Sequence, residues 1–331
     1  MEGQQPVEAA QDASARPTAQ PAAASTQAFG VLRLLVDPRP GKPVRQALPR
    51  LRAALEQRGV AHEVVTAAKA HPVEQLARTA ASKDGVRYLV AVGDDRTVHE
   101  TLNGLFSGGT PLAPDLVLGI VAAGAATDFA ANFGLDRPPE ILAGHLASAH
   151  EMPIDVGTVS CTGPGGATRH RVFANVAQVG YAADAVRHRD RLPRALGRVG
   201  DLLAAYWAIA GLRRQVTKVS VAHTAAELPV VNLVIANCQF VSRGMKIAPR
   251  ALPDDGRFNV QVFTGARSQV FLLTQRIFRG EHLPHPDITE WQSPSVALAP
   301  PQPLAVEADG QLLGRTPVEF GLLARAVRLK I

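Results

Sequence analysis

The chain has 331 residues and a formal net charge of +6, with 46% hydrophobic and 19% charged residues. This composition indicates a globular protein with a sizeable core, and the length favours two domains over one. No apolar run approaches the roughly 18 residues of a transmembrane helix, and the N-terminus lacks the basic start and apolar core of a secretory signal. Cys161 and Cys238 lie far apart without metal-type spacing, so we expect two small core residues in a reduced, cytoplasmic protein.

Residues 1–28 are rich in Ala, Gln, Pro and Ser and show no periodicity, so we expect a disordered tail. From residue 30 onward, strand-like and helix-like segments alternate. Strands are expected at 30–36, 60–66, 88–92 and 116–121, with amphipathic helices between them. This alternation predicts a doubly wound, mostly parallel sheet with helices on both faces, in an α/β domain over residues 29–151.

The turn after the third expected strand holds a dense polar motif, Gly93-Asp94-Asp95-Arg96-Thr97. Val98 and Leu102 then recur at helical spacing. Thr97 followed by Glu100 three residues later predicts a capping box that starts this helix. A strand, a polar turn and a helix N-terminus form the place where α/β sheets bind phosphate, because free N–H groups point into it.

After residue 152 the pattern changes to short β-type runs separated by Gly, Pro and polar turns. We expect a separate antiparallel β domain over residues 152–331 that includes the final strands of the chain. Asp254-Asp255-Gly256 and Asp309-Gly310 are hairpin-type turn signals within it.

A helical insert over about residues 187–218 holds eight basic residues and only two acidic ones, a surplus as large as the net charge of the whole chain. Such a segment is often a solvated helix face. Its basic residues alternate with leucines and Trp207, which also suits an anionic membrane surface. Nucleic-acid binding is the least favoured use, because no recognition module accompanies the insert.

These motifs resemble those of the diacylglycerol kinase catalytic domain, which is shared by bacterial lipid kinases and sphingosine kinases. That family carries Gly-Gly-Asp-Gly-Thr, then Glu and Asn-Gly-Leu. The same frame here reads Gly93-Asp94-Asp95-Arg96-Thr97, Glu100 and Asn103-Gly104-Leu105, with two glycines replaced. The family's second motif, Pro-x-Gly-Thr-Gly-Asn-Asp-Phe-Ala, is matched at Gly124, Asp128, Phe129 and Ala130. Later matches occur in the same order at Gly244-Met245, Asp255-Gly256 and Asp309-Gly310, so the resemblance covers residues 30–331.

The resemblance implies an N-terminal α/β domain that binds nucleotide and a C-terminal β-sandwich domain that binds lipid, as in NAD kinase and diacylglycerol kinase. It implies ATP- and Mg²⁺-dependent phosphorylation of a lipid hydroxyl, such as that of diacylglycerol, by a protein peripheral to the inner face of the cytoplasmic membrane. Asp309 would be the catalytic base and Asp255 a ligand of a structural Mg²⁺. The implied nucleotide-binding residues are Asp37, Gly41, Gly93, Asp95, Arg96, Thr97, Gly124, Thr127 and Asp128. The identity of the lipid and a homodimeric state are left open.

Several of these residues also have a purely structural explanation. Asp95 and Asp128 suit turns or first helical turns, and Asp309 suits a hairpin. Arg96 either grasps a phosphate or fills the nucleotide cleft, where it would pair with Asp94 or Asp95. The altered glycine loops therefore leave two alternatives to the lipid kinase: a lipid-binding protein of the same fold that has lost ATP, and an enzyme similar to NAD kinase.

Overall fold

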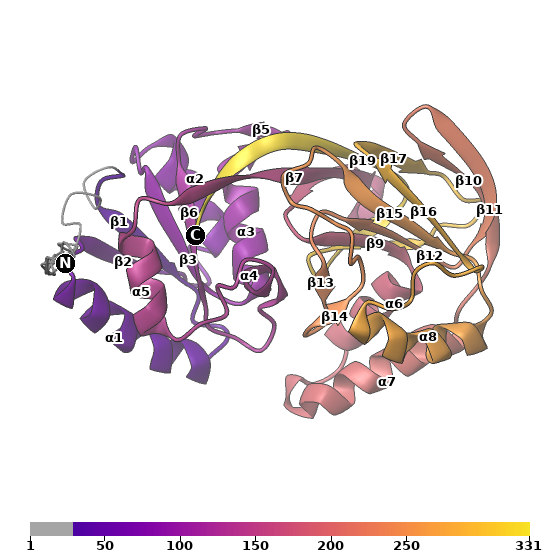
Figure 1. Cartoon of the computed structure of the whole chain (residues 1–331), viewed down its shortest axis with the longest axis horizontal. Coiled ribbons are helices and arrows are strands. Elements are labelled where there is room, and N and C mark those ends of the chain that lie inside the picture. Colours follow the sequence, from indigo (N-terminus) through magenta and orange to yellow (C-terminus); the bar gives the residue numbers. More distant parts are fainter. Residues whose placement is uncertain (1–28) are drawn as a thin grey trace, which may run out of the picture.

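The computed structural model describes residues 29–331, which form two lobes joined by two long strands (Figure 1). The disordered tail expected over residues 1–28 lies outside the described residues. The N-terminal lobe contains residues 29–150 and the last residues of the chain. The C-terminal lobe contains the β-sandwich and its helices.

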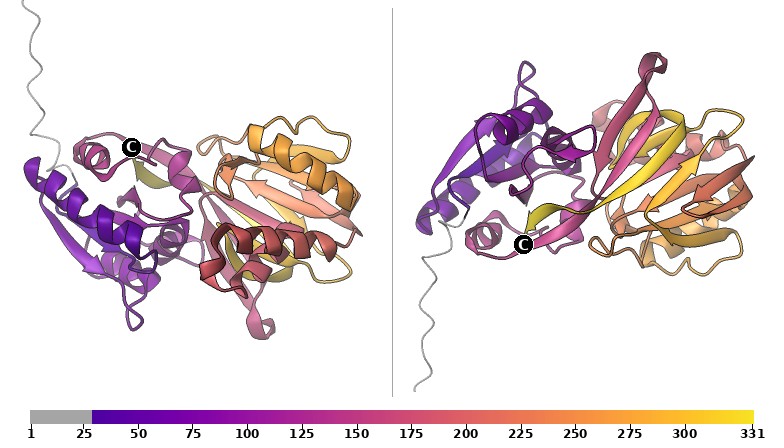
Figure 2. Two further views of the ribbon diagram at one scale, coloured as in Figure 1. Left: turned by 90° about the horizontal axis from the view of Figure 1, so that it is seen from below. Right: turned by 90° about the horizontal axis from the view of Figure 1, so that it is seen from above.

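Four parallel strands build the sheet of the N-terminal lobe in the order β2-β1-β3-β6: β1 (Leu32–Val36), β2 (His62–Thr66), β3 (Tyr88–Gly93) and β6 (Val117–Ala122). Every residue of β3 is buried, as expected of a strand covered on both faces. Helices α1 (Lys42–Gln57) and α5 (Pro139–Ala147) pack together on one face, and α2 (Val73–Ser82) and α3 (Asp95–Leu105) on the other (Figure 2). The expected parallel sheet is confirmed. Smaller elements are the hairpin of β4 (Phe106–Ser107) and β5 (Thr110–Pro111) and the short helix α4 (Asp128–Ala131).

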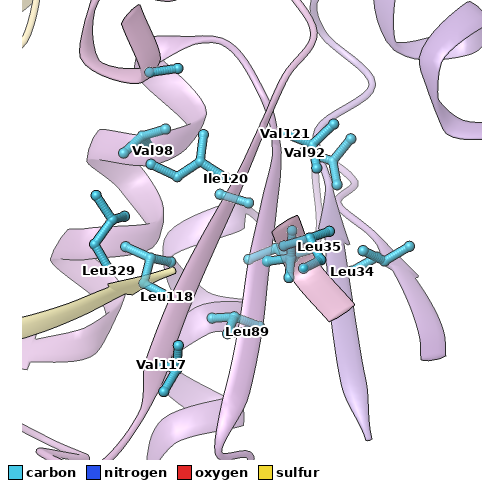
Figure 3. Packing of buried hydrophobic residues seen from close by; sticks show 14 of the residues in the cluster. Leu34, Leu35, Leu89, Val92, Val98, Val117, Leu118, Ile120, Val121 and Leu329 are labelled. Atoms are coloured by element: carbon cyan, nitrogen blue, oxygen red, sulfur yellow. The ribbon is translucent and has the colours of Figure 1, made fainter. Parts of the chain in front are cut away.

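Two long antiparallel strands, β7 (Glu151–Thr162) and β19 (Gln311–Lys330), run from one lobe into the other. At its end β19 pairs in parallel with β6, where Arg328 lies opposite Val117. Leu329 is fully buried in the N-terminal core beside Leu118 (Figure 3). The final strand therefore lies in the second domain, as expected, but its last residues also complete the sheet of the N-terminal lobe, a pairing that the sequence did not predict.

The C-terminal lobe is an antiparallel β-sandwich, as expected. One sheet has the order β16-β15-β12-β9-β18-β19, and the other contains β11, β10, β17, β19, β7 and β8. Phe173, Phe258 and Phe320 pack between the sheets, with the first two rings stacked at 5.6 Å. The bounds are β8 (Thr168–Phe173), β9 (Val176–Gly180), β10 (Gln215–Val221), β11 (Thr224–Val230), β12 (Asn232–Ala236), β13 (Phe240–Val241), β14 (Met245–Lys246), β15 (Phe258–Phe263), β16 (Ile288–Ser293), β17 (Ser295–Leu298) and β18 (Ala305–Ala308).

The helices of this lobe are α6 (Tyr181–Asp190), α7 (Gly197–Ala210) and α8 (Arg267–Arg279), with short 3₁₀ turns at Pro164–Gly166 and Arg194–Leu196. The basic insert expected near residues 187–218 thus covers the end of α6, all of α7 and the start of β10. Helices α7 and α8 lie side by side along one edge of the lobe (Figure 1). No helix within residues 29–331 is long and apolar enough to cross a membrane.

Candidate active site

The turn between β3 and α3 is closed by Asp94, which is the N-cap residue of α3. Its Oδ1 accepts a hydrogen bond from Thr97 N at 3.2 Å, and Thr97 Oγ1 accepts one from Asp94 N at 3.3 Å. The capping box expected between Thr97 and Glu100 is therefore wrong, since the helix begins earlier and Thr97 is its third residue. Gly93 must be glycine, because a Cβ there would lie 2.2 Å from Thr97 Oγ1.

Asp95 connects this turn to the loop that follows β6. Its carboxylate accepts hydrogen bonds from Asp128 N at 2.8 Å and from Phe129 N at 3.1 Å, at the start of α4. Burial, and after it the charge of Asp128, raises the pKa of Asp95 to about 7. Gly124 packs directly on Asp94, because a Cβ at position 124 would lie only 2.5 Å from Asp94 Cβ. The two loops after β3 and β6 are thus fixed to each other by Asp95.

The loop after β6 also presents a row of backbone donors. Between Gly124 and Thr127, none of the four consecutive N–H groups has a hydrogen-bond partner in the described part of the chain. Ala125 is exposed, and Thr127 occupies the N-cap position of α4 without a side-chain cap bond. Consecutive free N–H groups in a turn form a concave site that suits an anion.

Asp128 and Asp309 lie on the two sides of the seam between the lobes. Asp128 accepts from Arg243 N at 2.8 Å and from Gly244 N at 2.7 Å, which explains the Gly244 motif. Asp309 has a left-handed φ of 49° and accepts from Ala174 N and Asn175 N at 3.1 and 2.9 Å. Acids from both lobes therefore meet at one seam.

His99 is a site residue that the sequence reasoning missed. Its Nδ1 lies 3.0 Å from Asp309 Oδ2, and both side chains are 6% exposed. Asn103 Nδ2 lies 3.2 Å from His99 Nε2, which leaves Nδ1 to donate to Asp309. The sequence does place His99 and Asn103 one turn apart on the inward face of a helix. It does not show that His99 contacts Asp309, which lies 210 residues further along the chain.

A second group of charges surrounds the loop after β1. Asp37 is 1% exposed and accepts from Arg39 N, Arg39 Nε and Thr97 Oγ1, each at 2.9 Å. Burial would raise the pKa of Asp37, but the hydrogen bonds from Arg39 and Thr97 outweigh it and lower that pKa. Arg39 also binds both carboxylate oxygens of Glu100, at 2.9 and 2.6 Å. Gly41 ends the same loop with φ 72° and is the N-cap residue of α1.

Arg96 extends this group. Its Nε donates to Glu100 Oε1 at 3.0 Å, so it pairs with neither Asp94 nor Asp95. The pairing expected if Arg96 filled the cleft is thus wrong. The side chain is 42% exposed, and its two terminal nitrogens have no partner within residues 29–331. An anchored guanidinium with free donors suits a phosphate.

Asp255 makes none of these contacts across the seam. It is exposed, and within residues 29–331 it accepts only from Arg257 N, at 3.0 Å, in its own turn. The neighbouring Gly256 N donates instead to the buried Asp155, at 2.7 Å. Among the described residues, no group of three His, Cys, Asp or Glu side chains could hold a metal ion. Asp95 still fits a Mg²⁺ that carries waters and substrate phosphates, because each of its oxygens accepts only one hydrogen bond.

A cavity of about 430 Å³ adjoins the seam. Its walls are largely apolar, with Phe133, Met152, Phe240, Leu252 and Ile331, and Asn132 lines it as well. Asn132 Nδ2 contacts Asn175 Oδ1 at 3.4 Å, and Asn175 N is bonded to Asp309. Asn175 therefore links Asn132, in the wall of the cavity, to Asp309.

Two family models match the chain. The diacylglycerol kinase catalytic domain matches residues 31–159, and the YegS C-terminal NAD kinase β-sandwich-like domain matches residues 175–331. The diacylglycerol kinase of Bacillus subtilis (strain 168) is 23% identical over 301 residues, covering 90% of this chain and 95% of its own length. A protein of Klebsiella pneumoniae (strain 342) named "Probable lipid kinase YegS-like" is 26% identical over 251 residues, 74% of this chain and 78% of its own length.

Solved structures have the same fold. A crystal structure of a diacylglycerol kinase from Bacillus anthracis str. Sterne superposes with a TM-score of 0.66 at 19% identity, covering 91% of this chain and 96% of its own. The two family models follow one another along the chain and correspond to the two lobes. The chain belongs to the diacylglycerol kinase catalytic-domain family of lipid kinases.

Proposed function

We propose that the protein transfers the terminal phosphoryl group of ATP, with Mg²⁺, to a hydroxyl group of a membrane lipid such as diacylglycerol. One observation carries this proposal: four free N–H groups at Gly124–Thr127 lie beside carboxylates that meet at the seam between the lobes. Phosphoryl transfer needs phosphate positioning, neutralisation of charge and a base, and little else from the protein.

In this proposal the phosphates lie on the Gly124–Thr127 amides and the free nitrogens of Arg96, near the loop ended by Gly41. The buried Thr97 hydroxyl is already bonded to Asp37, so Thr97 braces the loop and does not itself touch phosphate. Asp95, with Asp128 beside it, is the residue that would hold a Mg²⁺. When bound, that ion would supply positive charge to the phosphates.

Asp309 is the proposed base, which takes the proton of the attacking lipid hydroxyl. It is held by three backbone N–H groups and by His99, so its carboxylate has a fixed direction. The cavity next to Asn132 suits the first methylenes of the lipid. Filling it with Leu252→Trp should raise the KM for lipid and leave ATP binding unchanged. Asp255 remains a candidate ligand of a structural Mg²⁺. The other ligands of that ion would then be oxygens other than carboxylates, such as backbone carbonyls and water.

The proposed lipid surface is the α7–α8 face, defined by Leu202, Tyr206, Trp207, Phe271 and Leu272. These side chains are between 44% and 75% exposed. Arg191 and Arg198 of the basic insert are exposed and have no acidic partner in the described residues, unlike Arg187, which pairs with Asp184. Exposed aromatic and leucine side chains beside unpaired arginines suit an anionic bilayer, on which the protein would act as a peripheral enzyme.

Vesicle binding tests this surface. The protein should sediment with vesicles containing phosphatidylglycerol, less with phosphatidylcholine alone, and less at high salt because exposed charges are then screened. Arg191→Glu with Arg198→Glu should weaken binding, whereas Arg52→Glu on α1, remote from this face, should not. Binding that ignored both salt and lipid charge would contradict the proposal.

Transfer of radiolabelled phosphate from ATP to diacylglycerol in mixed vesicles tests the activity itself. We expect Mg²⁺-dependent labelling of the lipid, and ATP binding measurable by calorimetry in the absence of lipid. Protein that binds lipid vesicles but shows no heat of ATP binding, with or without Mg²⁺, would favour a lipid-binding protein without kinase activity.

A further inference from the structure

A largely buried chain of polar groups runs from the first turn of α6 to the Asp309 turn. Ala182 N, in the first turn of α6, donates to Asn232 Oδ1 at 3.1 Å. Asn232 Nδ2 donates to Gln178 Oε1 at 3.2 Å, and Gln178 Nε2 donates to Glu307 Oε1 at 3.0 Å. From the other end, Gly310 N donates to Glu307 Oε2 at 2.9 Å.

Strand register explains why these side chains meet. Gln178 on β9 lies directly opposite Glu307 on β18, and opposite Val234 on β12, so Asn232 is its diagonal neighbour. Alternate residues of a strand share one face of a sheet, and opposed or diagonal side chains are within reach of each other. Asn232 and Glu307 are each 2% exposed, so water has little access to these two side chains.

The direction of the hydrogen bonds dictates the residue type at 307. Both ends of the chain are backbone N–H groups, which can only donate. Each amide side chain accepts with its oxygen and donates with its nitrogen, so the direction must reverse once along the chain. A carboxylate, with two accepting oxygens, allows the reversal. An amide side chain at position 307 would leave one N–H of the chain without its protein acceptor, and rotating Asn232 or Gln178 would only move that conflict elsewhere.

We infer that Glu307 is a positioning residue that fixes the Asp309–Gly310 turn and ties it to the first turn of α6, the helix whose end begins the basic insert. Asp309 and Gly310 both have left-handed φ values, of 49° and 72°, as in a two-residue hairpin turn, and Glu307 holds the N–H of the second of them. The position two residues after Asp309 carries the neutral Gln311, so the carboxylate beside this turn comes from Glu307, two residues before it. The catalytic meaning of this contact rests on the proposed role of Asp309.

The pKa of the Glu307 carboxyl group depends on its burial and on its hydrogen-bond partners. Burial, opposed by the bonds from Gln178 and Gly310 and assisted by the charge of Asp309, raises the pKa of Glu307 to about 8, so both oxygens are carboxylate acceptors above that pH and the variants are compared there. The positioning role itself stands on the geometry of the four hydrogen bonds.

Three variants test the inference: Glu307→Gln, the control Glu319→Gln on the exposed side of β19, and the exchanged pair Gln178→Glu with Glu307→Gln. In the exchanged pair, the carboxylate now at position 178 would accept from Asn232 and from the new amide at position 307. The oxygen of that amide would accept from Gly310, so every donor is again satisfied. Hydrogen exchange of residues 305–314 should accelerate at least tenfold in Glu307→Gln, return toward wild type in the exchanged pair, and stay unchanged in the control.

Kinetics give a second readout. Glu307→Gln should lower kcat for lipid phosphorylation at least tenfold with the KM for ATP within about twofold, and the exchanged pair should recover most of it. Unchanged exchange in Glu307→Gln, or an exchanged pair no better than the single variant, would overturn the inference. If the wild-type protein labelled no lipid, the proposed function would fail, and hydrogen exchange would still decide whether Glu307 holds the turn.

Discussion

The two groups of acids around the nucleotide loops are held in opposite ways. Asp37 and Glu100 are neutralised by side-chain cations, Arg39 and Arg96, and the pKa values of both acids are lowered by these partners against the effect of burial. Asp95 and Asp128 accept hydrogen bonds only from backbone N–H groups in the described chain, and the pKa of Asp95 is raised to about 7. Side-chain cations thus compensate the first group, whereas the two acids at the seam have no cationic side-chain partner in the described chain, so we expect a bound cation at the seam.

The largest effect should come from the seam, at Asp309. Asp309→Asn removes the proposed base while keeping the size of the side chain, so kcat for lipid phosphorylation should fall by about 10²–10⁴. Steady-state kinetics on mixed vesicles measures this. The exposed Asp136→Asn serves as control and should keep full activity. An Asp309→Asn enzyme within threefold of wild type would remove Asp309 from the chemistry.

The paired group should matter for stability. Arg39→Met would leave the buried Asp37 without its cation, and breaking such a pair costs about 3 kcal/mol in the free energy of unfolding. Urea unfolding measures this loss. Arg50→Met is a matched control, because the Arg50–Glu140 pair is exposed at both ends and should contribute little to the free energy of unfolding. Equal losses in the two variants would contradict the distinction between the groups.

Arg96 belongs to the paired group, but the two terminal nitrogens of its guanidinium have no partner in the described chain. Arg96→Gln should weaken ATP binding roughly tenfold, as expected for losing about 1.5 kcal/mol from a charged hydrogen bond. Its melting temperature should change little, because the pair with Glu100 is partly exposed. Calorimetry with an ATP analogue measures the affinity, and Arg52→Gln, which disrupts another pair at the same spacing, should bind ATP like wild type. Unaltered affinity in Arg96→Gln would place this guanidinium outside the phosphate site.

The smallest effect concerns pH. Asp95 has a pKa of about 7 when folded and 3.8 as its ordinary value, so in this range the folded state holds a proton that the unfolded chain lacks. Its contribution to stability therefore falls as pH rises from about 4 to about 7. In Asp95→Asn, the decrease in melting temperature with pH that Asp95 causes should disappear. The decrease that Glu307 causes, up to about pH 8, should remain. Mg²⁺ should stabilise wild type more at pH 8 than at pH 5, and an effect independent of pH would argue against a cation at Asp95.

The fold could be predicted from sequence to the level of its two lobes. Alternating strand and helix patterns are local, and the parallel sheet and the β-sandwich occur where these patterns predict them. The end of β19 could not be predicted in this way. Its residues are as β-like as those before them, and only the pairing of Leu329 with Leu118 shows that they complete the first sheet.

The acids of the site were likewise visible in the sequence, because Asp95, Asp128 and Asp309 each follow a strand in a turn or helix-start signal. Their partners were not visible. The sequence predicts Thr97 as an N-cap residue, but Asp94 occupies that position in the structure. Glu100, predicted as part of the same cap, instead accepts hydrogen bonds from Arg39 and Arg96.

The sequence alone thus determined which elements form and which side chains can carry charge, since these depend on neighbours a few residues away. Tertiary structure decided the partner of each charge: His99 for Asp309, Arg39 for Glu100, and Gln178 for Glu307. Hydrogen bonds and ion pairs act over about 3 Å in space. Residues separated by tens to hundreds of positions come within that distance only after the lobes have packed.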